Sequence, residues 1–146
     1  MLLKSPPPPA FIYLMPLLFP VLWILVTFAI SRMGWHALAE RYQTREPFYG
    51  KKTGLLTASI NWSNYKNSLL LQYNEAGMHL QPVVIFRLFH PPVLIPWSEI
   101  KKVTHTQFVF AKSTELIIGE PKVAKIMMPQ KRYLQMQQDY PQYLHA

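Results

Sequence analysis

A single apolar segment near the N-terminus constrains this chain more than any other feature. Lys4 and Arg32 bracket 27 residues that carry no charge, and 18 of the 21 residues from 10 to 30 are hydrophobic. A helix rises 1.5 Å per residue, so residues 10–30 measure about 30 Å, the thickness of the hydrocarbon core of a bilayer. The segment is therefore predicted to be a transmembrane helix, bent near Pro16 and Pro20.

Two other interpretations of this segment fit less well. A buried core helix seldom runs this long without a charge. A cleavable signal peptide has a candidate site at Ala37-Leu38-Ala39. However, the apolar stretch exceeds the roughly 7–15 residues of a signal peptide's apolar region, and Arg32 lies between it and that site. The proline-rich residues 5–9 are predicted to form a short extended stub ahead of the helix.

The charges on the two sides of the segment indicate its orientation. Lys4 lies on the N-terminal side, whereas the C-terminal side carries Arg32, Arg41, Arg45, Lys51 and Lys52 within about 20 residues. Positively charged flanks are retained in the cytoplasm. We therefore expect a single-pass protein of the cytoplasmic (inner) membrane, with its N-terminus outside and residues 32–146 in the cytoplasm.

An amphipathic pattern follows the apolar segment. Apolar side chains recur at i, i+3, i+4 and i+7, which is one face of a helix: Trp35, Leu38, Ala39 and Tyr42. The opposite face carries His36, Glu40, Arg41 and Gln43. Such a helix lies in the headgroup zone or packs on the next domain, and we expect packing. Pro47 is predicted to end it, with residues 44–48 as a linker.

From about Gly50 the period of the apolar residues changes from 3.6 to 2. Apolar and polar residues alternate from Leu56 to Trp62, which is typical of a half-buried strand. Trp62 and Trp97 are both expected to be buried. Further strands or apolar runs are predicted at 68–73, 78–81, 83–89, 93–95, 103–110, 115–118 and 123–128, separated by turns at 63–67, 74–77, 90–92 and 111–114.

A helical pattern returns at residues 131–140, where Tyr133, Met136 and Tyr140 share a face. About seven antiparallel strands followed by one helix is the pleckstrin-homology-like (PH-like) arrangement, a sandwich or small barrel with one open end that a helix caps. The fold class is therefore α+β. We expect three parts: residues 1–31 (stub and transmembrane helix), 32–48 (juxtamembrane helix and linker) and 49–146 (PH-like β domain with its C-terminal helix).

Several short motifs add a resemblance to this interpretation. They are Gly34-Trp35 with Leu38-Ala39 and Tyr42, then Gly77-Met78-His79-Leu80, Phe86-Arg87, His90-Pro91-Pro92, and Ile95-Pro96-Trp97-Ser98-Glu99-Ile100. Together they resemble a family of uncharacterised bacterial single-pass membrane proteins with a PH-like cytoplasmic domain. The resemblance covers residues 34–103 best and implies a fold. It supplies no catalytic residues.

The residue inventory disfavours an enzyme. Cysteine is absent and Asp139 is the only aspartate, so thiolate chemistry is excluded and carboxylate pairs have little material. None of the histidines (His36, His79, His90, His105 and His145) pairs at i+3 or i+4, and His79 and His105 are expected to face solvent. We therefore expect no catalytic, cofactor-binding or metal site, no cofactor and no small-molecule substrate.

The charge balance points to an anionic surface. Fifteen Lys and Arg against seven Asp and Glu give a net charge of +8. The candidate membrane-surface contacts are Arg32, Arg41, Arg45, Lys51 and Lys52, each adding about 1 kcal/mol near anionic lipid. The alternative is that they are solvated charges that only set topology. Nucleic acid is disfavoured, because the basic and aromatic residues at Lys131-Arg132-Tyr133 are a weak signal and membrane tethering argues against it.

Two functional hypotheses remain. The first is a non-enzymatic membrane-anchored interaction module, a small subunit or accessory factor of an integral-membrane complex, whose helices dock on other subunits through Phe19, Trp23 and Trp35. The second is a PH-like module that senses lipid headgroups at an anionic membrane surface. Phosphoinositide-binding PH domains carry basic clusters in their first hairpin loop, whereas the loop predicted here offers only Lys66.

Overall fold

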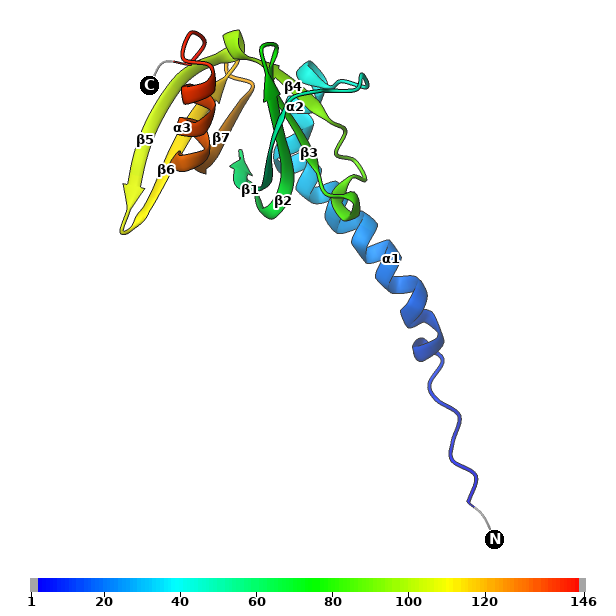
Figure 1. Cartoon of the computed structure of the whole chain (residues 1–146). Helices are drawn as coiled ribbons and strands as arrows, with labels where there is room; N and C mark the ends of the chain where they lie inside the picture. Colours follow the sequence, from blue (N-terminus) through cyan, green and yellow to red (C-terminus); the bar gives the residue numbers. More distant parts are fainter. Residues whose placement is uncertain (1–2, 145–146) are drawn as a thin grey trace.

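The apolar segment forms the first half of one long helix. The computed structural model describes residues 3–144. Helix α1 (Phe11–Ile30), a π-helical turn η1 (Ser31–Trp35) and helix α2 (His36–Tyr42) follow one another without a break, giving 32 helical residues. The apolar half projects away from the rest of the chain and is almost entirely exposed (Figure 1). Within residues 3–144 this is the one helix long and apolar enough to cross a membrane, and only 6% of its most apolar 18-residue window is buried.

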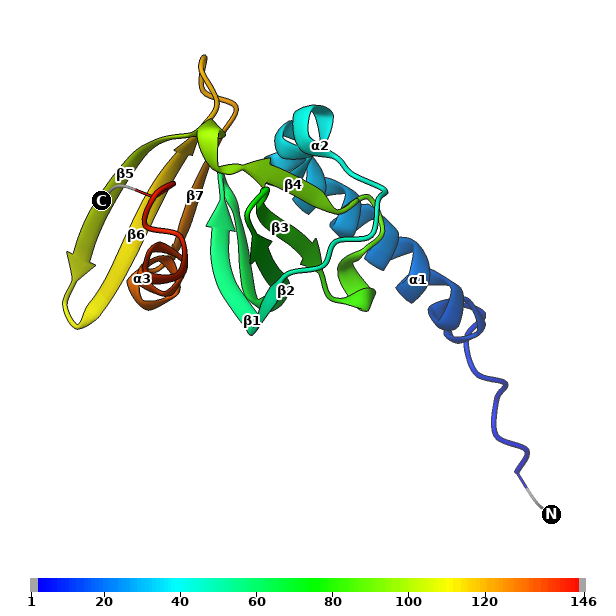
Figure 2. The same ribbon diagram turned by 45° about the horizontal axis from the view of Figure 1, so that its top comes forward.

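The rest of the chain forms one antiparallel sheet of seven strands. They are β1 (Lys51–Ile60), β2 (Ser63–Asn74), β3 (Gly77–Pro82), β4 (Val93–Pro96), β5 (Ile100–Phe108), β6 (Ala111–Ile118) and β7 (Ala124–Pro129), in the spatial order β4-β3-β2-β1-β7-β6-β5. Strands β1 and β7 pair only at Ser59–Met127 and Ile60–Ile126. The sheet curls at this short pairing into a half-barrel (Figure 2), so the predicted α+β, PH-like architecture is confirmed.

Helix α3 (Gln130–Asp139) follows β7 directly and packs on β6 and β7. Its Tyr133 and Met136 are fully buried in the same core as Leu56, Ala58 and Ile60 of β1. The ring of Tyr140, just after the helix, packs on Tyr73 and Trp97 at centroid distances of 6.0 and 5.9 Å. The C-terminal helix therefore caps the open sheet, as its apolar face predicts.

The two tryptophans predicted to be buried behave differently. Trp97 is 5% exposed, and its indole donates to the carbonyl of Asn74. Trp62 is 86% exposed, so the prediction for Trp62 is wrong. Strand β1 ends at Ile60, and Asn61 turns the chain with a φ of 53°. The alternation of faces stops where the turn begins, and the tight turn lies at Asn61-Trp62 instead of 63–67.

Three other details differ from expectation. Residues 83–89 are not a strand, since Val84–Phe86 form a single 3₁₀ turn, η2. The β5–β6 turn lies at Val109-Phe110 instead of 111–114. His79 is 6% exposed, because the linker ring of Phe48 stacks on it at 4.9 Å, and burial lowers the pKa of His79. His105 is exposed, as predicted.

A polar contact fastens the end of α3 to the sheet and gives a first prediction. The Asp139 carboxylate accepts from Lys51 Nζ at 2.8 Å and from the buried Tyr73 hydroxyl at 2.5 Å. These two donors hold the pKa of Asp139 below its usual value. Asp139→Ala should lower Tm more than Lys51→Ala, because only the first substitution removes the carboxylate that accepts from the buried Tyr73 hydroxyl.

The same contact predicts a pH dependence. A lowered folded-state pKa means that the carboxylate stabilises the fold fully at neutral pH, and this contribution is lost below about pH 4 as Asp139 takes up a proton. Thermal melts of the wild type and of Asp139→Ala between neutral and acidic pH test this. The difference in Tm between them should shrink as the pH falls, and a constant difference would show that ionisation of Asp139 is irrelevant.

Candidate functional site

The most elaborate part of the chain is the junction between the apolar helix and the β domain. At Gly34 the helix backbone touches the end of β1 so closely that an added Cβ would lie 2.1 Å from the carbonyl oxygen of Ile60. A glycine is required there, because any larger residue would push the helix off the strand. The neighbouring Trp35 is fully buried. The helix therefore enters the core of the domain at this point.

Trp35 is held by contacts on several sides. Its Nε1 donates to the carbonyl of Pro91 at 2.7 Å, and its ring packs on Tyr65 and His90 at 5.8 and 5.6 Å. His90 is itself buried, and burial lowers its pKa, so the ring is neutral at pH 7. Its Nδ1 faces the carbonyl of Leu88 at 2.8 Å and must carry the proton. Its Nε2 therefore accepts from the Tyr65 hydroxyl at 3.0 Å.

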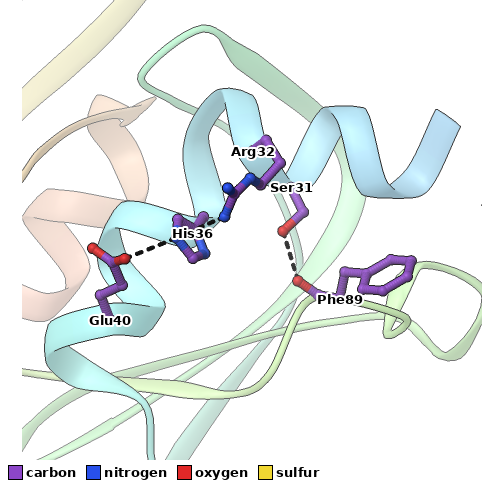
Figure 3. Close-up of polar contacts among 5 residues, drawn as sticks. All are labelled: Ser31, Arg32, His36, Glu40 and Phe89. Carbon is purple, nitrogen blue, oxygen red and sulfur yellow. Dashed lines mark hydrogen bonds and ion pairs between the residues drawn. The ribbon is translucent and has the colours of Figure 1, made fainter. Parts of the chain in front are cut away.

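Two hydroxyl groups tie the end of the apolar helix to the domain. Ser31 Oγ donates to the carbonyl of Phe89 at 2.7 Å (Figure 3), and Ser63 Oγ donates to the carbonyl of Ile30 at 2.7 Å. Both serines are buried. Three parts of the chain thus meet where the apolar stretch ends: the helix, the β1–β2 turn and the β3–β4 segment. These contacts fix the position of the domain relative to the helix.

A second set of polar groups lies on the outer side of the same helix. Figure 3 shows His36 between Arg32 and Glu40, with His36 Nε2 at 2.8 Å from both Arg32 Nη1 and Glu40 Oε1. Nε2 of His36 carries either a proton or a lone pair, so it cannot bond to both neighbours at once. When Nε2 carries a proton it donates to the Glu40 carboxylate, and when it carries a lone pair it accepts from the Arg32 guanidinium. These side chains are partly or fully exposed, and they mark the polar face that the sequence predicts.

The predicted basic contacts do not form one patch. All five are exposed, as expected of membrane-surface contacts or of solvated charges: Arg32, Arg41, Arg45, Lys51 and Lys52. Arg41 lies 3.6 Å from Glu99, and Lys51 pairs with Asp139. Lys51 begins β1, whose other end touches Gly34, so at about 3.3 Å per residue it lies roughly 30 Å along the strand from the junction. The structure brings Arg32 alone of these to the end of the apolar helix.

The predicted helix-docking residues also have different surroundings. Phe19 is 70% exposed. Trp23 is half-buried against the chain itself, with its ring 5.4 Å from that of Phe86. Trp35 is fully buried in the domain and is not accessible to another protein's helix. Of the three, Phe19 is the one whose side chain is mostly exposed.

Two exposed features escaped the sequence analysis. Phe108, Val109 and Phe110 form the tip of the β5–β6 hairpin and are 82%, 66% and 95% exposed. Trp62 in the β1–β2 turn lines a small pocket together with Lys122 and Lys125. Alternating patterns assign residues to faces of strands, so they overlook side chains at turns. The available signal was the run of three apolar residues, Phe108-Val109-Phe110, beside a hairpin turn.

The titratable side chains of the described residues were compared with the requirements of a metal site. Within residues 3–144 no three His, Asp or Glu side chains lie close enough together to hold a metal ion; His145 lies outside the described residues. Comparison with protein-family models, with curated proteins and with solved structures gives no match. The junction and the exposed surfaces beside it are therefore the candidate functional features of the chain.

Proposed function

We propose that this chain is a non-enzymatic, membrane-anchored interaction module, a small subunit or accessory factor of an integral-membrane complex. The observation that carries the proposal is the unbroken helix Phe11–Tyr42, of which one half is apolar and exposed while the other half is part of the domain core. No linker separates anchor from domain. The anchor therefore holds the domain at one height and orientation, which suits a protein that positions partners beside a membrane.

Two exposed apolar surfaces could bind partner proteins, and both support the proposal. Along α1, Met15, Leu18, Phe19, Val21, Leu22 and Leu25 line a shallow apolar groove, where another transmembrane helix can pack. The β5–β6 tip carries three exposed apolar side chains in a row. Clustered exposed apolar residues of this kind mark interaction sites in soluble domains. The first surface suits a membrane subunit, and the second suits a soluble region of the same complex.

Sensing of lipid headgroups is the second candidate, and one observation favours it. Trp62 shares its pocket with Lys122 and Lys125, and the adjacent Ser63 bonds to Ile30 at the end of the apolar stretch. Tryptophan is enriched at membrane–water interfaces, and lysines near the surface attract anionic lipid. In this hypothesis the β1–β2 turn binds anionic lipid headgroups.

The orientation is part of the proposal and gives its own prediction. The positive charges on the C-terminal side of α1 favour a cytoplasmic domain and an outside N-terminus in the inner membrane of a bacterium. The chain has no cysteine. A single cysteine introduced at Ser5 or at Ser113 is therefore the only thiol, and its labelling shows on which side of the membrane that position lies. An impermeant thiol reagent added to intact cells should label Ser5→Cys only. Labelling of both positions, or of Ser113→Cys alone, would contradict this topology.

Purification in mild detergent separates the two functions. An interaction module should co-purify with the same proteins at fixed stoichiometry, and Phe110→Ser should weaken this association while the neighbouring Lys112→Ser should not. A lipid sensor would instead elute alone and bind anionic vesicles, less strongly as salt increases, because exposed charges are screened. The second outcome would replace the first proposal with the alternative.

A further inference from the structure

The segment between β3 and β4 has an unusual surface for a loop. Residues 83–89 read Val-Val-Ile-Phe-Arg-Leu-Phe. Four of these side chains point outward, with exposed fractions of 71% (Val84), 62% (Ile85), 45% (Leu88) and 43% (Phe89). Connecting loops of soluble domains are normally polar, and consecutive exposed apolar residues are avoided there. This apolar surface therefore requires a covering.

The location of the segment identifies what covers it. In both ribbon views it lies beside α1 (Figures 1 and 2). Trp23 Nε1 donates to the carbonyl of Ile85 at 3.2 Å, and the rings of Phe28 and Phe89 meet edge to face at 5.2 Å. Trp23 precedes Ile30 by seven residues, which is about 10 Å along a helix. The segment thus runs alongside the apolar stretch, on the N-terminal side of Ile30, where that stretch ends.

Hydrogen bonding within the segment fits an environment without water. Two of its carbonyls accept from side chains of the long helix, that of Ile85 from Trp23 and that of Phe89 from Ser31, and the carbonyl of the following Pro91 accepts from Trp35. Other carbonyls accept from within the chain, those of Val83, Val84 and Arg87 from backbone N–H groups and that of Leu88 from His90. A loop in water needs no such donors, whereas carbonyl groups in lipid require partners within the chain, and the carbonyls named here have them.

The one charge in the segment fits the same environment. Arg87 Nε turns back and donates to the carbonyl of Pro82, where the segment begins. An arginine beside the hydrocarbon core directs its guanidinium toward phosphates at the interface. Phe89 has a φ of 63°, a left-handed conformation that is unfavourable for an ordinary residue. Its ring contact with Phe28 and the hydrogen bond from Ser31 to its carbonyl offset this cost.

We infer that residues 83–89 are a second membrane contact, inserted into the domain-side leaflet next to α1 with Val84, Ile85 and Leu88 in the acyl chains. The partner is the lipid bilayer itself, because the apolar surface is continuous with that of the helix. This inference rests, like the proposed function, on α1 spanning the membrane. It goes beyond the proposed function, because it adds a second membrane contact. The chain then inserts into the leaflet at two places, α1 and residues 83–89. Two contacts prevent the domain from tilting or from rotating about the helix axis.

Site-directed spin labelling of the full chain tests this insertion. Single cysteines are placed at Ile85 and Leu88, at Val26 on exposed α1 as the membrane reference, and at Glu75 in the exposed β2–β3 turn as the aqueous reference. Nitroxide-labelled protein is reconstituted into phosphatidylcholine–phosphatidylglycerol vesicles at high dilution. Relaxation by oxygen, which concentrates in hydrocarbon, is compared with relaxation by a water-soluble nickel complex.

We expect positions 85 and 88 to behave like position 26, with high access to oxygen and low access to nickel. Nickel access at 85 equal to that at 75 would overturn the inference. Low access to both reagents would show that protein covers the segment, which also overturns it. If position 26 itself were open to nickel, the membrane placement and the proposed function would both fail. Protection at 26 with exposure at 85 would remove only the inserted segment.

Discussion

Deletion of residues 130–146 is expected to abolish the cooperative melting of the β domain. Helix α3 has ten residues, fewer than the roughly 12–15 that make an isolated helix even marginally stable in water. Packing therefore holds it, and its fully buried Tyr133 and Met136 fill the open side of the curled sheet. Without them the core of β6 and β7 is open to solvent on that side.

Near-UV circular dichroism of the full-length and truncated chains in the same detergent measures this effect. Substitutions within the helix provide matched controls. Met136→Ala should cost about 2–5 kcal/mol of stability, whereas Leu134→Ala, at a position 43% exposed on the same helix, should change stability by about 0.5 kcal/mol or less. A truncated chain that melts as sharply as the full chain, yet no longer co-purifies with partners, would refute the capping role and favour a docking helix.

Replacement of Trp35 by alanine should have the second largest effect, a loss of about 3–5 kcal/mol. The side chain is fully buried, and its removal leaves a cavity between the helix and the sheet. It also removes the indole donor to Pro91 and the ring contacts to Tyr65 and His90. Because these partners lie on different elements, the helix, β2 and the β3–β4 segment loosen together.

Met33→Ala is the control, since Met33 lies in the same π-helical turn but is 50% exposed. Chemical denaturation followed by the fluorescence of the remaining tryptophans compares the two variants with the wild type. Met33→Ala should remain within about 0.5 kcal/mol of wild type. Equal stabilities for Trp35→Ala and Met33→Ala would mean that the junction contributes little to the fold.

The parts of this structure that depend on sequence periodicity were predictable. The apolar stretch predicted a long apolar helix, and the spacing of Trp35, Leu38 and Tyr42 identified the face that packs on the domain. Strict alternation placed Leu56, Ala58 and Ile60 inside the sheet. Periods of 3.6 and 2 report which residues share a face, and faces determine how layers assemble. The seven strands and the capping helix followed from these patterns.

The parts that depend on distant contacts were not predictable. Trp62 continues the alternation of β1 but lies in the turn beyond it, so its period carried no information on burial. His79 alternates outward from its strand, yet Phe48 of the linker covers it. The contact between Gly34 and Ile60 and the position of residues 83–89 beside α1 join segments that are 26 or more residues apart in sequence. No local pattern records such pairings.

Anchor and domain are expected to move as one rigid body, and a distance between spin labels on the two parts measures this. Nitroxides at Leu22 on α1 and Glu75 on the far turn of the domain, both exposed, are measured by pulsed electron–electron double resonance in lipid vesicles. A pair within the domain, Glu75 and Lys101, gives the reference width. The continuous helix predicts a single distance distribution as narrow as that of the reference pair. A broad or multimodal distribution would contradict the claim, because it would show a domain that moves freely on its anchor.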